Sequence, residues 1–105
     1  MATYICLSSF TEQGIRNVKE TTQRADAVRE SARKFGVTVK DIYWTLGNVD
    51  VVGVFEAEDE ASITAFALAL GSAGNVRTQM LRAFTKEEMK NVLKKMAGQK
   101  IAVPA

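Results

Sequence analysis

The stretch from Ile42 to Ala57 constrains the fold more than any other part of the chain, because it reads as two β-strands joined by a tight turn. Gly47 and Asn48, a pair that accepts positive φ, lie between two runs rich in β-branched and aromatic residues, which is a strong hairpin signal. With these two residues as the turn, Trp44 pairs with Val51. The sequence therefore predicts a hairpin with a defined register.

This register gives the predicted hairpin two different faces, because successive side chains of a strand alternate. One face is apolar and must be covered: Ile42, Trp44, Leu46, Val49, Val51, Gly53 and Phe55. The other face is mixed: Tyr43, Thr45, Asp50, Val52, Val54 and Glu56. We expect Trp44 in the core, with Gly53 leaving room for its indole. The mixed face is too apolar to be left in water, so we expect it to be partly covered.

The flanking segments predict an alternation of strands and helices, from residue periodicity and from capping signals. The expected elements are a strand at 3–9, a helical region at 11–36 broken near Gly14 and residues 21–22, a strand from about 39 with a bulge near Lys40 and Asp41, a strand ending at 57, a helix around 63–70, an edge strand at 76–84, and a last helix opened by a capping box at 85–88. In the first helical region, an apolar stripe is expected to run from Ile15 to Phe35.

The order of these elements is βαββαβ with an appended helix. Two right-handed crossovers interlocked around the hairpin give a four-stranded antiparallel sheet with both main helices on one face. The predicted fold is therefore α+β, of the ferredoxin-like type, with one sheet face uncovered by its own chain. A chain of 105 residues is long enough to bury a core, and we expect residues 1–105 to form a single domain.

Composition removes several classes of function. The chain has no histidine, which excludes Ser-His-Asp and Cys-His nucleophiles and the commonest zinc and haem ligand sets. Cys6 is the only cysteine, so we expect a buried thiol, a reducing compartment and a cytoplasmic protein. A net charge of +2 does not call for nucleic acid or a membrane as partner, and we expect no cofactor and no metal.

Three segments together resemble the GYD domain family: residues 43–52, residues 4–15 and residues 74–78. The resemblance covers most of residues 2–96 and implies the dimeric α+β barrel variant of the ferredoxin-like fold, without implying an activity. Gly47 and Asp50 match the family pattern, whereas Val49 stands in the place of the tyrosine.

The candidate ligand-binding residues are Tyr43, Thr45, Asp50 and Tyr4. Asp50 begins a strand on the face of Tyr43 and Thr45, where a carboxylate can take a proton or fix a ligand. The structural interpretation, in which Asp50 accepts hydrogen bonds from the turn or from Thr45, is favoured over the chemical one. Tyr43 is expected to pack across a dimer interface rather than to bind a ligand. Tyr4 and Cys6 lie either on the face of Tyr43 or against the helices.

Three classes of function remain, in order of preference. The first is a small oligomeric domain that binds a small molecule or has a regulatory role. The second is a cofactor-independent enzyme, an isomerase or monooxygenase, with Asp50 and Tyr43 as acid and base. The third, RNA binding through the sheet, lacks the basic and aromatic pattern in residues 50–56. We expect a homo-oligomer, at least a dimer, formed through the face of Tyr43, Val52 and Val54.

Overall fold

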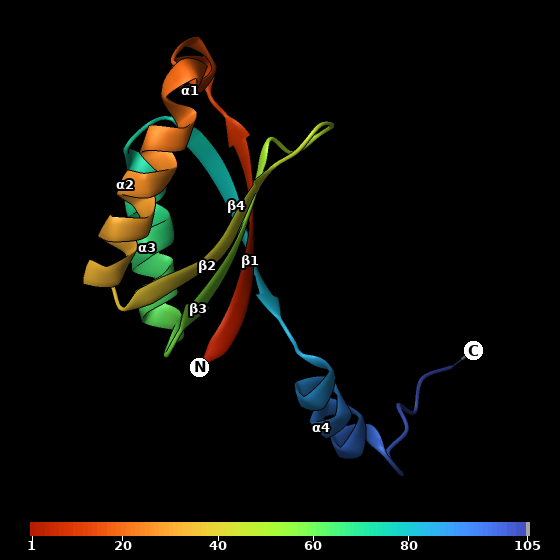
Figure 1. Cartoon of the computed structure of the whole chain (residues 1–105). Helices are drawn as coiled ribbons and strands as arrows, with labels where there is room; N and C mark the ends of the chain where they lie inside the picture. The colour runs from red at the N-terminus through yellow and green to blue at the C-terminus, as the bar shows by residue number, and fades with distance from the viewer. Residues whose placement is uncertain (105) are drawn as a thin grey trace.

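The computed structural model describes residues 1–104 as one four-stranded sheet with helices on one side of it (Figure 1). Its elements are β1 (Ala2–Phe10), α1 (Glu12–Arg16), the 3₁₀ turn η1 (Val18–Glu20), α2 (Thr21–Lys34), β2 (Val37–Trp44), β3 (Val51–Ala57), α3 (Glu60–Ser72), β4 (Val76–Ala83) and α4 (Lys86–Met96). The strand order is β2-β3-β1-β4, and every neighbouring pair is antiparallel. The predicted ferredoxin-like α+β fold is confirmed, with β4 at an edge.

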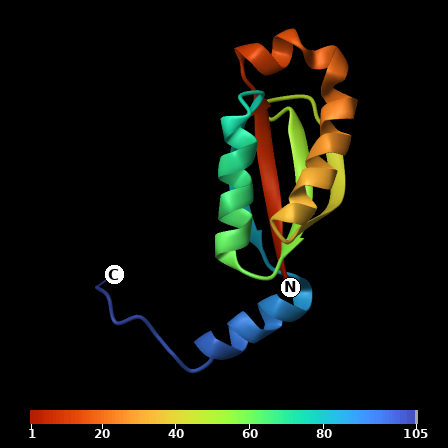
Figure 2. The same ribbon diagram turned by 90° about the vertical axis from the view of Figure 1, so that its left-hand side faces the viewer.

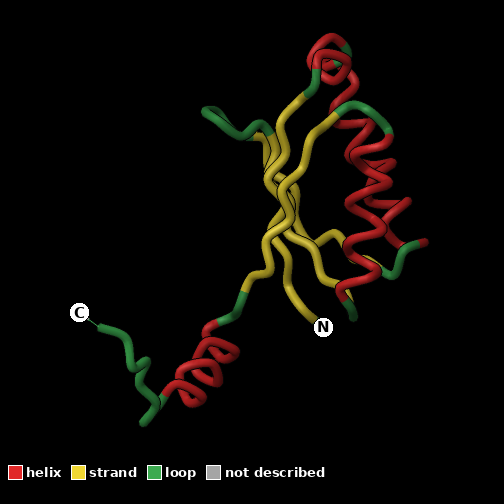
Figure 3. Tube along the Cα trace, turned by 180° about the vertical axis from the view of Figure 1, so that it is seen from behind, coloured by secondary structure: helices red, strands yellow, loops and turns green. Residues whose placement is uncertain are grey.

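The helices α2 and α3 lie side by side over one face of the sheet, as Figure 2 shows from the helix side. Seen from behind in Figure 3, α1, α2 and α3 all lie on the same side of the strands. The connection between β2 and β3 projects toward the opposite side, and so does α4. We call that opposite side of the sheet the open face.

The register of the central hairpin is confirmed, but its turn is not. Ile42 pairs with Gly53, and Trp44 pairs with Val51. The strands end there, so residues 45–50 form the connection instead of a two-residue turn. Gly47 has φ 115°, but no residue other than glycine has positive φ among those described, so Asn48 does not complete the type I′ turn. Leu46 is fully exposed at the tip, where the apolar face was expected to be covered.

Two irregularities expected from the sequence are found in the structure. The register of β2 against β3 shifts between Val39 and Asp41, which is the predicted bulge. The first helical region is divided into a short and a longer helix as expected, but the break lies at Asn17 and η1, just before Thr21, and Gly14 lies inside α1 instead of breaking it. The continuous apolar stripe expected across it is wrong, because the break reorients the chain and leaves Ile15 exposed.

The core lies between the sheet and the two helices α2 and α3. Its buried apolar residues are Tyr4, Cys6, Ala32, Val37, Val39, Phe55, Ala57, Ile63 and Phe66. Phe66 of α3 meets Phe55 of β3 edge to face, with ring centroids 5.5 Å apart, a favourable aromatic geometry. The Phe55 ring, rather than the Trp44 indole, occupies the space that Gly53 leaves open, since a Cβ at Gly53 would lie 2.9 Å from it.

Trp44 is not a core residue, contrary to expectation. Its side chain belongs to the helix-covered face but is 44% exposed, and its indole Nε1 donates a hydrogen bond of 3.0 Å to Thr21 Oγ1 of α2. The reason is its position at the end of β2, where α2 begins and the helix layer no longer covers the strand.

The predicted last helix is present as α4, with its capping box complete. Thr85 Oγ1 accepts from the Glu88 backbone N–H, and the Glu88 carboxylate accepts from the Thr85 N–H. These hydrogen bonds and the Arg82 guanidinium lower the pKa of Glu88. The helix and the extended segment after it project away from the rest of the molecule, whose radius of gyration is 16.8 Å. A compact domain of this length has about 13 Å.

The aromatic contact in the core gives a stability prediction. Phe66 is 2% exposed and contacts Phe55 and Phe35, so Phe66→Ala should lower the free energy of unfolding by about 3–5 kcal/mol in urea melts. The control, Leu68→Ala on the same helix, removes a side chain that is 70% exposed and should stay within about 0.5 kcal/mol of wild type. A loss below about 1 kcal/mol for Phe66→Ala would contradict this packing.

Candidate functional site

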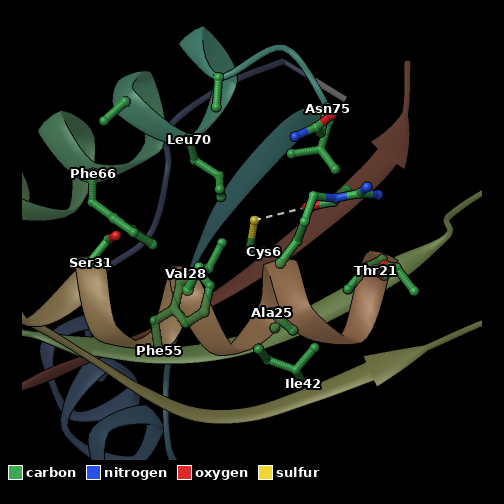
Figure 4. Close-up of a pocket in the computed structure, with 18 of the residues that line it drawn as sticks. Cys6, Thr21, Ala25, Val28, Ser31, Ile42, Phe55, Phe66, Leu70 and Asn75 are labelled. Atoms are coloured by element: carbon green, nitrogen blue, oxygen red, sulfur yellow. Dashed lines mark hydrogen bonds between the residues drawn. The ribbon is translucent and has the colours of Figure 1, made fainter. Parts of the chain in front are cut away.

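A cavity of about 420 Å³ lies between the sheet and the helices α2 and α3 (Figure 4). Ligand pockets in proteins usually have volumes of roughly 300–1,000 Å³. The cavity is open to solvent on one side, where the exposed residues Ala27, Ser31 and Trp44 line it. It is the candidate functional site.

The wall of the cavity is mostly apolar. One side comes from α2, where Thr21, Ala25, Val28 and Ser31 follow each other along one face of the helix (Figure 4). Phe66 and Leu70 of α3 stand across from them. The floor is the sheet, with Ile42, Trp44, Val51, Gly53, Phe55, Cys6, Ser8 and Phe10.

The cavity exists because small side chains face each other across the layers. Helix α2 contributes Ala25 and Ser31, and α3 contributes Ala69 where a larger residue would fill the space. Beneath them, the Phe55 ring lies over Gly53 and forms that part of the floor. Since neighbouring layers cannot collapse fully onto one another, the missing side-chain volume remains as a cavity.

Polar groups lie at two places in the cavity. On the floor, Cys6 Sγ and Ser8 Oγ are 3.4 Å apart and hydrogen-bonded. Burial raises the pKa of the Cys6 thiol, against a smaller lowering by the Ser8 hydroxyl. The thiol therefore stays protonated at neutral pH and is a weak nucleophile. The Cys6 thiol is a weakly polar, polarisable group on the apolar floor of the cavity.

The second polar group is a cluster of Thr21, Arg24 and Asn75. Arg24 Nη1 donates 2.7 Å to the Asn17 carbonyl, and Nη2 donates 3.3 Å to the Gly14 carbonyl. These bonds hold the guanidinium beside the cavity while leaving further N–H donors available, because a guanidinium has five. The site thus combines an apolar body with one positive charge, which suits an apolar molecule bearing an anionic or carbonyl group.

The segment before α1 closes this end of the cavity against the loop before β4. Thr11 Oγ1 donates 2.5 Å to the Gly74 carbonyl, and the Thr11 N–H donates 3.1 Å to the Asn75 carbonyl. A Cβ at Gly14 would lie 1.9 Å from Asn75 O, so only glycine allows this approach. Two segments about 60 residues apart in sequence are thereby fixed together at the cavity wall.

The four candidate residues from the sequence are not brought together. Tyr4 is buried in the core on the helix-covered face and pairs with Phe55. Tyr43 is 57% exposed on the open face. Thr45 lies in the connection after β2, and its hydroxyl donates to the Val49 carbonyl. None of the four lines the cavity.

Asp50 has a clear structural contact. Its Oδ2 accepts a hydrogen bond of 2.8 Å from the Phe10 backbone N–H, and its own N–H donates to the Ser8 carbonyl. The structural interpretation named the turn or Thr45 as the donor: Thr45 N–H donates 2.9 Å to the Asp50 backbone carbonyl, whereas the donor to the carboxylate is the end of β1. A charged acceptor on a backbone N–H ties the connection between β2 and β3 to β1.

Sequence reasoning missed Thr21, Arg24, Ser31 and Asn75 as site residues. The sequence feature that could have indicated the site was the small size of inward-facing residues, namely Ala25 and Ser31 on one helix and Ala69 on another. Among residues 1–104 no group of three or more Cys, Asp or Glu is placed to hold a metal ion. No helix in that range is long and apolar enough to cross a bilayer.

Sequence similarity to known proteins supports a family assignment. The model of the GYD domain matches residues 4–93, which is most of the chain. The chain belongs to the GYD domain family. It is also similar to a protein of Thermus thermophilus named glutamine synthetase and cystathionine beta-lyase binding protein, with 40% identity over 84 residues, which cover 79% of this chain and 88% of the relative.

The structure places the segments by which this GYD domain resembles its family. Residues 4–15 and 74–78 meet at the closed end of the cavity through Thr11, Gly14 and Asn75. Residues 43–52 form the end of the central hairpin, which Asp50 ties to β1. Residues 10–15 of the first segment therefore meet the other two segments at one end of the sheet, whereas residues 4–9 run along β1 toward the other end.

Proposed function

We propose that this GYD domain is a regulatory binding protein, in which a small apolar molecule occupies the cavity beneath α2 and α3 and the chain acts on partner proteins as a homo-oligomer. The cavity of about 420 Å³ is the observation that supports ligand binding most directly. The relative's name supports action through other proteins. The buried, unpaired Cys6 fits a reducing compartment, and we place the protein in the cytoplasm.

The lining suggests the chemical class of the ligand. Its aromatic and aliphatic walls favour a largely apolar body, which gains from leaving water. A guanidinium favours a carboxylate or sulfonate at the end near Arg24 and Asn75. The ligand class is therefore a small aromatic or aliphatic molecule with one anionic group.

Binding of 8-anilinonaphthalene-1-sulfonate, an apolar aromatic anion, tests the cavity. The only tryptophan of the chain, Trp44, lines it, so bound probe should quench Trp44 fluorescence in the folded protein. Ala25→Phe, which fills the cavity from α2, should weaken binding by at least about tenfold. Ala65→Phe, at an exposed position of α3 outside the cavity, is the control and should bind as wild type does. Equal affinity in both variants would place the probe elsewhere.

The second part of the proposal concerns protein partners. The relative is named for binding glutamine synthetase and cystathionine beta-lyase, and 79% of this chain aligns with it at 40% identity. We extend that role to this chain and take the same two enzymes as the first partners to test. Binding that depends on an occupied cavity would make the protein a sensor for its ligand.

Sedimentation velocity measures such a complex directly. At micromolar concentration, this chain should cosediment with purified glutamine synthetase or with purified cystathionine beta-lyase. An unrelated enzyme of similar mass serves as the control and should leave the chain at its own sedimentation rate. Free sedimentation of the chain beside both enzymes would contradict this part of the proposal and leave ligand binding untouched.

The third part is assembly through the open face. Three apolar pairs cross its centre: Leu7 with Val52, Ile5 with Val54, and Ile5 with Leu81 on the other side of β1. Tyr43 extends this patch on β2, opposite Val52. Contiguous apolar surface of this kind marks interfaces, and a two-fold axis buries the same patch from both chains.

Light scattering tests the assembly. Val52→Lys places like charges near the two-fold axis in a desolvated site, so it should split the oligomer into single chains. Thr64→Lys, at an exposed position of α3, introduces the same residue on the far side of the sheet and should leave the mass unchanged. A wild-type mass of one chain, or an oligomeric Val52→Lys protein, would contradict assembly through this face.

The alternative of a cofactor-independent enzyme using Asp50 and Tyr43 has no specific observation in its favour. The Asp50 carboxylate is engaged by the Phe10 N–H, and Tyr43 lies on the open face, away from the cavity. An acid and base acting together must both reach one substrate, and these two residues do not share a pocket.

A further inference from the structure

Helix α4 presents an apolar stripe to solvent. Its four large apolar residues recur at the spacing of one helix face and are between 40% and 61% exposed: Met89, Val92, Leu93 and Met96. Phe84, in the short link before the helix, is 54% exposed. Figures 1 and 2 show α4 projecting from the end of the sheet, away from α2 and α3. A stripe of this kind normally packs against another surface.

A helix in this position needs such a surface to be stable. Isolated helices shorter than about 12–15 residues are marginal in water, and α4 has 11 residues. Its capping box satisfies backbone groups at one end only. Most helical stability in proteins comes from packing an amphipathic face, so the ordered helix implies a partner for its apolar stripe.

Charge indicates where that partner surface lies. Four lysines and two glutamates lie on α4, and Glu88 is already paired with Arg82. The part of β2 and β3 nearest the start of β1 carries the opposite sign. Glu56 is paired with Lys40, their charged atoms being 3.8 Å apart. That leaves the carboxylates of Asp41 in β2 and of Glu58, the first residue after β3. Arg33 of α2 lies at the same surface as Glu58.

This acidic region lies at the end of the sheet from which α4 leaves. Ala57, the last residue of β3, pairs with Ala2 of β1, and Ala83, the last residue of β4, pairs with Thr3. Helix α4 follows β4 directly, so both the helix and the acidic region belong to the end of the sheet where β1 begins.

Symmetry brings the two surfaces together in a dimer through the open face. A two-fold axis parallel to the strands places β4 of one chain opposite β2 of the other, with the same ends of the sheets aligned. Helix α4 then approaches the acidic region of the other chain's β2 and β3. An axis perpendicular to the strands would instead bring the lysines of α4 toward the end of β4 that carries Arg77, where like charges repel.

We infer that α4 is an exchanged arm, which packs its apolar stripe on a second copy of this chain at the acidic region of that copy's β2 and β3. The inference rests on the open-face dimer proposed above. The exchange is reciprocal, so both stripes are covered in one closed assembly. The contact made by α4 enlarges the interface that the two sheets form. A stable dimer buries roughly 800 Å² of surface on each partner.

Sedimentation equilibrium of the full chain tests the apolar contact. Leu93→Glu puts a carboxylate into the stripe without lowering helix propensity, and it should raise the dimer dissociation constant by at least about tenfold. Asn91→Glu adds the same charge on the opposite face of α4 and should leave the constant unchanged. Circular dichroism of both variants should show the wild-type fold of the body.

Charge reversal tests the docking place. Lys86 and Lys90 lie one turn apart beside the stripe, and Lys86→Glu with Lys90→Glu should weaken the dimer. Mixing that variant with a chain carrying Asp41→Lys and Glu58→Lys should restore association as a heterodimer. Failure to restore it would overturn the placement at β2 and β3.

The outcomes separate this inference from the proposed function. A wild-type protein that sediments as one chain would overturn both the open-face dimer and the arm. A wild-type dimer whose dissociation constant is unchanged by Leu93→Glu would overturn the arm alone and leave the open-face dimer standing. Weakening by Leu93→Glu but not by Asn91→Glu, with restoration in the mixed charge variants, is the result expected from an exchanged arm.

Discussion

The alternation of side chains along β1 is the constraint on which the rest of the structure depends. This strand is central, paired with β3 on one side and β4 on the other. Tyr4, Cys6 and Ser8 point to the helices, so Ile5 and Leu7 must point to the open face. One strand thereby contributes to the floor of the cavity on one side and to the centre of the uncovered patch on the other. A slip of one residue would exchange the two.

The layer above β1 is only partly filled, and this determines what the site can do. Large aromatic residues, Phe55 and Phe66, close one part of the interlayer space. Small residues on α2 and α3 leave the rest open, with Trp44 and Arg24 at its wall. The cavity costs stability relative to a filled core, since it forfeits packing contacts. A chain that keeps such a cavity gains when a ligand restores those contacts, because binding to the folded state stabilises it.

The sequence by itself determined the element order, the register of the hairpin, the bulge in β2, the edge position of β4 and the capping box of α4. All of these depend on local chemistry: alternation, the residues that favour turns, and side-chain to backbone hydrogen bonds. It also suggested Asp50 as a structural acceptor, though not the identity of the donor, because Phe10 lies 40 residues away. Family resemblance agreed with the fold expected from the element order and added no site.

Only the tertiary structure decided where the cavity lies and which residues share it. Periodicity predicts that Trp44 and Ala25 face inward. It does not predict whether the space between them is filled, because that depends on the distance between the sheet and the helix layer. It could not place Tyr4 either, since both faces of β1 carry apolar residues. The exposure of Trp44 follows from where α2 begins relative to the sheet, and the cavity follows from the small side chains that meet between the layers. That is a property of the assembled layers, and no single segment specifies it.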